Sequence, residues 1–148
     1  MLKVGSLLSD IGSQELSRVT HSGSCVLLHV WSISCPACKS NMAHLQSLRD
    51  KYVGRGLQTV AMHMPRGEAE LDEATVRKVA DQIGVTEVLL LDNDRSIADA
   101  FGVNAVPAYF LFDAEGKLRR HALGSFGIRM IGQAVQRLFG DAPQEVED

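Results

Sequence analysis

The chain has 148 residues, of which 45% are apolar and 22% charged, a composition that fits one globular domain with a full hydrophobic core. Its net charge of −3 gives no basic field for nucleic acid or an anionic membrane surface. Residues 1–9 contain no long apolar run, and no segment approaches the roughly 20 apolar residues that span a bilayer. We therefore expect a cytoplasmic protein if the chain is complete, and an extracytoplasmic one if an export signal or anchor was trimmed.

Apolar periodicity predicts alternating helices and strands. In chain order, the first half should contain a helix over 8–19, a strand over 25–31, a helix over 36–52 and a strand over 57–62. The second half should contain a helix over 71–83, a strand over 88–91, a short helix over 97–101, hairpin strands over 108–112 and 117–123, and a helix over 128–139. The acidic residues 141–148 are expected to form a disordered tail after a single domain over 1–140.

This order of elements predicts an α/β fold. The early strand–helix–strand–helix–strand succession favours parallel pairing with crossover helices. The late hairpin adds an antiparallel edge. The expected architecture is therefore a mixed sheet of about five strands flanked by helices.

The cysteines carry the chemical signal. The odd count of three argues against a disulfide-stapled scaffold. Cys35-Pro36-Ala37-Cys38 directly follows a buried strand and opens a helix, and a helix N-terminus stabilises a thiolate at Cys35. Cys38 follows at i+3, on the same side of the first turn, so the two can form a disulfide. We expect an exposed Cys35 to attack a partner disulfide and a more buried Cys38 to resolve the mixed disulfide.

A zinc site is the competing interpretation of this pair. Zinc sites need two further ligands, commonly a second Cys pair or a His pair. The chain has no second C-x-x-C, and its five histidines show no H-x-x-x-H spacing. The redox interpretation is preferred, with no metal and no cofactor other than the redox-active Cys35–Cys38 disulfide.

Two segments resemble the thioredoxin family. Residues 31–39, WSISCPACK, look like its active-site segment. Residues 101–113, FGVNAVPAYFLFD, with Gly116-Lys117 following, resemble its cis-proline strand and hairpin. The extra helix and strand over 71–91 are typical of the TlpA/ResA-like branch, which is related to the peroxiredoxins. The resemblance covers residues 27–138 and implies a thioredoxin-like fold with an inserted helix–strand unit.

The resemblance also implies site residues. It places a cis Val106–Pro107 bond opposite Cys35, with the Val106 backbone pairing with an extended substrate strand; a plain strand-start proline is the alternative. The residues expected to contact substrate are Trp31, Pro36, Ala37, Val106 and Pro107. Core packing is an equally consistent role for Trp31. Substrates of membrane-anchored relatives, such as apocytochrome c, do not carry over to this chain.

The chain departs from the thioredoxin pattern at three positions. Ser34 replaces the tryptophan before the first cysteine and could cap the helix instead. Ala43 replaces a helix proline found in many thioredoxins. His29 stands six residues before Cys35, where thioredoxins carry a buried aspartate. We expect His29 to accept the proton that Cys38 must lose; a hydrogen-bonded core histidine is the alternative.

Other candidates have plainer interpretations. Cys25 is expected to be a small core residue, and Lys39 a surface residue. Met62-His63-Met64 contains soft ligands suited to Cu(I), but adjacent strand residues point to opposite faces.

Three functions remain open. The leading hypothesis is disulfide exchange by a monomer whose partners are protein thiols or disulfides and a thiol reductant. A thiol peroxidase is weakened because Ser32 only partly replaces the threonine of a Thr-x-x-Cys arrangement. A non-catalytic adaptor is disfavoured because both cysteines are retained, and metal analysis of the reduced protein would test a metallochaperone.

Overall fold

Five strands form one mixed sheet in the computed structural model, which describes residues 1–141. The strands are β1 (Cys25–Trp31), β2 (Leu57–His63), β3 (Val88–Leu91), β4 (Ala108–Phe112) and β5 (Leu118–Leu123). They lie in the order β3-β2-β1-β4-β5. β1 pairs in parallel with β2, and β2 with β3, whereas β4 is antiparallel to both β1 and β5. The predicted mixed sheet is confirmed.

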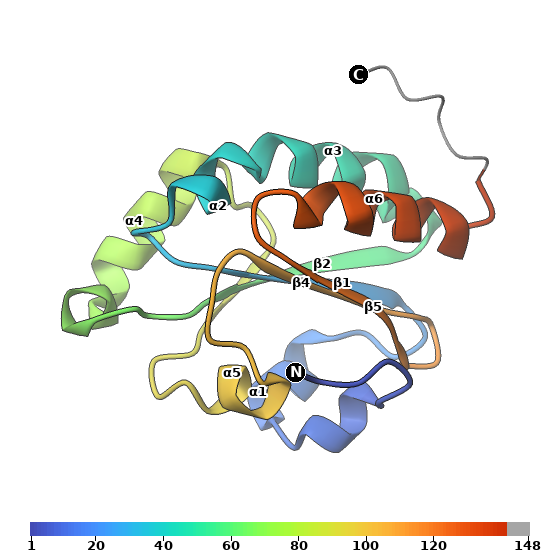
Figure 1. Cartoon of the computed structure of the whole chain (residues 1–148), viewed down its shortest axis with the longest axis horizontal. Helices are drawn as coiled ribbons and strands as arrows, with labels where there is room; N and C mark the ends of the chain where they lie inside the picture. The colour runs from blue at the N-terminus through green and yellow to red at the C-terminus, as the bar shows by residue number, and fades with distance from the viewer. Residues whose placement is uncertain (142–148) are drawn as a thin grey trace.

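Helices cover both faces of the sheet (Figure 1). One face is covered by α2 (Pro36–Ser40), α3 (Met42–Tyr52), α4 (Glu73–Ile83) and α6 (Gly127–Leu138). The other face is covered by α1 (Gln14–Val19) and α5 (Ser96–Phe101). Short 3-10 turns complete the chain at η1 (Leu8–Ile11), η2 (Val53–Arg55) and η3 (Glu68–Leu71). None of the helices that the structure describes is both long and apolar enough to cross a membrane.

The central strand β1 contributes to a separate hydrophobic core on each side of the sheet. Leu27 and Trp31 pack with the residues of α3, α4 and α6, whereas Val26, Leu28 and Val30 pack on the opposite face. Because side chains alternate along a strand, His29 lies on the same face as Leu27 and Trp31, beneath α2 and α3. This alternation places a polar group under the cysteine pair.

Two predicted helices are interrupted. The helix expected over 8–19 is broken where Gly12 adopts a left-handed φ of 76°, and Ser13 then caps α1 by accepting a hydrogen bond from the Leu16 N–H at 3.1 Å. The helix expected over 36–52 is divided at Asn41, whose ψ of −7° departs from the α-helical value of about −42° and separates α2 from α3.

Smaller differences lie at other boundaries. α4 begins two residues later than expected because η3 precedes it, and β2 extends one residue further, to His63. The expected tail over 141–148 lies outside the described residues apart from Asp141.

Candidate active site

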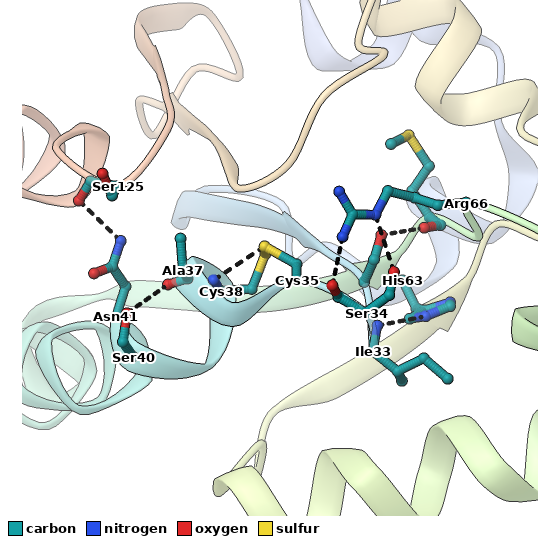
Figure 2. Close-up of a disulfide and its surroundings, with 12 residues drawn as sticks. Ile33, Ser34, Cys35, Ala37, Cys38, Ser40, Asn41, His63, Arg66 and Ser125 are labelled. Carbon is teal, nitrogen blue, oxygen red and sulfur yellow. Dashed lines mark hydrogen bonds between the residues drawn. A yellow bond between two sulfur atoms is a disulfide. The ribbon is translucent and has the colours of Figure 1, made fainter.

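The cysteine pair opens α2. Cys35 is the N-cap residue, and Pro36 occupies the first helical turn, where its missing N–H costs little. The backbone N–H of Cys38 donates to the Cys35 sulfur over 3.1 Å, and the two residues are joined as a disulfide with a Cα–Cα distance of 5.3 Å (Figure 2). The Cys35 sulfur thus caps the N-terminus of α2. The expectation that Ser34 caps this helix is wrong.

The two cysteines do not differ in exposure. Each is 3% exposed in this disulfide form, because both belong to the apolar cluster against which Ile33, Ala37 and Val106 pack. The expected contrast between an exposed Cys35 and a buried Cys38 is therefore wrong for the oxidised protein. What distinguishes the two sulfurs is the hydrogen bond that Cys35 receives from Cys38.

The proline segment lies beside the pair. The Val106–Pro107 peptide bond is cis, and Pro107 lines the same small cavity as Cys38. Val106 is half-buried, and Pro107 is buried. Between the cysteines, Pro36 is exposed and Ala37 half-buried. These positions leave Pro36, Ala37 and Val106 accessible at the edge of the pair.

Trp31 lies beneath this surface and not on it. Its side chain is 1% exposed and packs edge-on against the His63 ring, with centroids 5.0 Å apart. The expected direct contact between Trp31 and substrate is therefore wrong, and Trp31 instead packs below the site. Burial in the core leaves no indole surface for a partner.

His29 forms a buried pair with a residue that the sequence had not singled out. Its Nε2 lies 2.9 Å from Oε2 of Glu87, and the two side chains are 3% and 5% exposed. Burial alone would raise the pKa of Glu87, but the hydrogen bond from His29 and the charges of His29 and Arg49 lower it to about 2. Glu87 is thus ionised at neutral pH. The Arg49 guanidinium lies 3.6 Å from its other oxygen.

His29 and Cys38 share a small cavity. It measures about 10 Å³ and is also lined by Asn41, Pro107 and Tyr109, among others. A space of this size holds about one water molecule. In the neutral imidazole whose Nε2–H is donated to Glu87, Nδ1 is the nitrogen of His29 that can accept a proton.

A second buried His–Glu pair contacts the residues directly before Cys35. The Ile33 N–H donates to Nε2 of His63 over 3.2 Å (Figure 2). Oε1 of Glu70 lies 3.5 Å from the same nitrogen. Burial lowers the pKa of His63, and the Glu70 carboxylate only partly opposes this effect. A neutral His63 is therefore the acceptor that holds Ile33. Within residues 1–141, His63 Nδ1 and Glu70 Oε1 have no hydrogen-bond partner.

Ser34 links this pair to a surface arginine. Its hydroxyl donates to Oε2 of Glu70 over 2.7 Å, while Arg66 donates to the Ser34 hydroxyl and to the Ser34 carbonyl oxygen over 3.0 and 2.6 Å. These partners are 32 to 36 residues away in the chain, so only the fold brings them together. Ser32 next to this segment is buried, and its hydroxyl donates to the Met64 carbonyl.

The remaining candidates lie apart from the pair. Cys25 is a half-buried free thiol at the start of β1, and burial together with the charges of Asp113 and Glu115 raises its pKa. Met62 and Met64 pack in the core on one face of the sheet, whereas His63 packs against Trp31 on the other, so the three do not converge on a copper ion. No group of three or more His, Cys, Asp or Glu in the described part of the chain could hold a metal ion.

Sequence comparisons show which known proteins this chain resembles. Residues 6–121 match the model of the AhpC/TSA family. The chain is 39% identical over 115 residues to the thiol-disulfide oxidoreductase YkuV of Bacillus subtilis, covering 78% of this chain and 77% of that protein. It is 27% identical over 132 residues to the thiol-disulfide oxidoreductase ResA of Geobacillus thermodenitrificans, covering 89% and 73%.

Solved structures show the same fold. A thioredoxin-like protein in its oxidised form superposes with a TM-score of 0.70 at 39% identity, over 78% of each chain. StoA from Bacillus subtilis superposes with a TM-score of 0.64 at 19% identity, over 78% of this chain and 81% of that one.

Proposed function

This chain belongs to the AhpC/TSA family and is a thiol–disulfide oxidoreductase of the TlpA/ResA-like branch, and from that premise we propose that Cys35 attacks protein disulfides and Cys38 resolves them. The observation that carries this order is the 3.1 Å hydrogen bond from the Cys38 N–H to the Cys35 sulfur. An N–H directed at sulfur favours the thiolate over the thiol. The same bond cannot activate Cys38, which supplies the donor.

The proposed reaction transfers two electrons to the partner. The Cys35 thiolate attacks one sulfur of the partner disulfide, the partner S–S bond breaks, and the other partner sulfur leaves as a thiolate. Cys38 then loses its proton and attacks the Cys35 sulfur of the mixed disulfide. The second partner sulfur leaves as a thiolate, so the partner is reduced to a dithiol and the enzyme holds the Cys35–Cys38 disulfide. A thiol reductant returns the enzyme to its reduced form.

His29 is proposed as the acceptor for the proton of Cys38. It lines the same water-sized cavity as Cys38, and its Nε2–H donates to an ionised Glu87. The carboxylate stabilises the imidazolium that forms when Nδ1 takes a proton, directly or through one water. Deprotonation of a buried thiol is unfavourable without such an acceptor.

The accessible edge of the pair is the proposed partner-binding surface. Pro36, Ala37 and Val106 are at least partly exposed, and Pro107, which follows Val106, lines the same cavity as Cys38. An extended partner segment pairing with the Val106 backbone would bring its own sulfur to Cys35. Partners are therefore proteins with accessible disulfides or thiols.

Trapping and labelling test the order of attack. Brief iodoacetamide treatment of the reduced protein at neutral pH, followed by mass mapping, is expected to label Cys35 well before Cys38 and Cys25. Cys35→Ser is expected to abolish insulin disulfide reduction, whereas Cys38→Ser is expected to accumulate a mixed disulfide with insulin. Faster labelling of Cys38, or trapping by the Cys35→Ser protein, would overturn the assignment.

His29→Gln tests the proton acceptor. It keeps a polar group beside Glu87 but removes the imidazole, so resolution of the mixed disulfide should slow by about 10²-fold while attack by Cys35 stays near the wild-type rate. His44→Ala, at an exposed histidine of α3, is the matched control and should change neither step. If both steps slow together, or neither changes, His29 is only a core residue.

A further inference from the structure

The loop that follows β2 holds the residues directly before Cys35. Arg66 donates from Nη2 to the Ser34 carbonyl oxygen over 2.6 Å and from Nε to the Ser34 hydroxyl over 3.0 Å (Figure 2). On either side of Arg66 in the chain, Glu70 on η3 accepts a hydrogen bond from the Ser34 hydroxyl, and His63 at the end of β2 accepts one from the Ile33 N–H. Ser34 and Ile33 are thus fixed from one side by three side chains.

The contacts fix the position of the Arg66 charge. A guanidinium stays charged at every pH at which the protein is folded, and its planar fork makes two hydrogen bonds in one geometry. The carbonyl group that it binds is joined directly to the Cys35 nitrogen, so the cation lies one peptide unit from the reacting residue. The residue is exposed, which leaves it able to face a partner or solvent beside the site.

We propose that Arg66 stabilises the thiolate form of Cys35, with Ser34 as the residue that positions its guanidinium. This inference rests on the proposed role of Cys35 as the nucleophile and adds a residue to it. An opposite charge near a thiol favours its ionised form. The same charge stabilises the reduced protein relative to the disulfide, because only the reduced form carries the thiolate.

Of the other titratable groups around Cys35, Glu70 and His63 supply no positive charge. Glu70 on η3 brings a carboxylate to the far side of the Ser34 hydroxyl, which opposes a thiolate. His63 on β2 is buried and neutral, as its lowered pKa indicates. Lys39 on α2 is exposed and lies one helical turn after Cys35. Without Arg66, the Glu70 carboxylate would still accept the Ser34 hydroxyl, but no cation would be hydrogen-bonded to Ser34.

The test measures Cys35 alkylation against pH by mass mapping, in Arg66→Gln, Arg66→Lys and wild-type protein. Arg66→Gln is expected to raise the pH midpoint of Cys35 labelling by about half a unit to one unit. This shift is at or below the smallest pKa shifts that a nearby opposite charge produces, because Arg66 is exposed. The equilibrium with glutathione should shift toward the disulfide by up to about tenfold, which corresponds to about 30 mV. Arg66→Lys, which keeps the charge, should recover at least half of the midpoint shift.

Salt and a second arginine provide the controls. The midpoint difference between wild type and Arg66→Gln should shrink in about 1 M salt, where exposed charges are screened. Arg77→Gln, at an exposed arginine of α4 paired with Glu73, should leave the midpoint unchanged. An unchanged midpoint in Arg66→Gln at low salt, or an Arg66→Lys protein identical to Arg66→Gln, would show that Arg66 only pins the loop and would overturn the proposal.

These outcomes are separable from failure of the proposed function. If Cys35 is not the nucleophile, it is not the fastest-labelled thiol in the wild-type protein itself. If only the Arg66 inference fails, Cys35 remains the fastest thiol in every variant and the midpoints coincide.

Discussion

Replacing Glu87 with glutamine removes one negative charge from a pair whose two side chains are 3% and 5% exposed. Glutamine has nearly the shape of a protonated glutamate and keeps an oxygen that can accept from His29. It cannot carry the charge that faces His29 and Arg49. The substitution therefore isolates the electrostatic part of the pair from its packing.

The magnitude follows from the titration of Glu87. Its pKa is lowered from 4.5 to about 2, and this difference corresponds to about 3 kcal/mol of folded-state stabilisation of the carboxylate. Breaking a buried pair by removing one partner costs a similar amount, about 3–5 kcal/mol. Because the folded pKa lies below the unfolded value, this stability is fully present above pH 4.5 and is lost as the pH falls toward 2.

Urea unfolding over a pH series measures this effect. At neutral pH, Glu87→Gln should be less stable than wild type by about 3 kcal/mol, and the gap should close progressively below pH 4.5. Glu73→Gln is the control, because Glu73 pairs with Arg77 at the surface, where both side chains are more than half exposed. It should change stability by less than about 1 kcal/mol. A gap that stays constant from pH 7 to pH 3 would refute the electrostatic reasoning and assign the loss to packing.

Two further predictions concern stability away from the site. Burial and the hydrogen bond to Asp141 raise the pKa of Tyr52 to about 12, so Tyr52→Phe should remove the highest step of the alkaline absorbance titration. The same substitution should lower the free energy of unfolding by about 1 kcal/mol. In the wild-type protein this stability is present below pH 10 and is lost as the pH rises toward 12. Gly132→Ala places a Cβ 3.8 Å from the nearest atoms of α3 and should raise the free energy of unfolding by about 1 kcal/mol. Gly127→Ala places a Cβ 3.2 Å from the Tyr109 ring and should lower the free energy of unfolding by about 1–3 kcal/mol. Urea unfolding of the two variants measures both changes.

The strands were the part of the fold most readily predicted from the sequence. The run from Cys25 to Trp31 has the predicted bounds because a strand buried on both faces leaves an apolar run, interrupted here only by His29. The two helix breaks were missed for different reasons. Gly12 followed by Ser13 is a visible stop and N-cap, whereas the break at Asn41 accompanies a side-chain bond to the Ser125 carbonyl, 84 residues away.

The candidate site was also predictable from the sequence only in part. Cys35, Cys38 and Pro107 belong to motifs that are contiguous in the chain, so residue order alone reveals them. Glu87 was not predicted, because it meets His29 from 58 residues away, just before the edge strand β3. Nothing in its neighbours distinguishes a carboxylate that turns inward from one that is solvated. Its partner was visible only as a histidine in an apolar strand.

Equal burial of the two cysteines changes how their roles must arise. In the disulfide form, exposure does not separate two cysteine residues that are each 3% exposed, so we look for the difference in the groups around them. Cys35 receives the Cys38 N–H and lies next to the Arg66–Ser34 contacts, which come from the loop after β2. Cys38 shares its cavity with His29, whose charge partner Glu87 comes from the segment before β3. In the proposed reaction the first step needs a stable thiolate and the second needs a proton acceptor, and the residues proposed for these two tasks, Arg66 and His29, come from different elements of the fold.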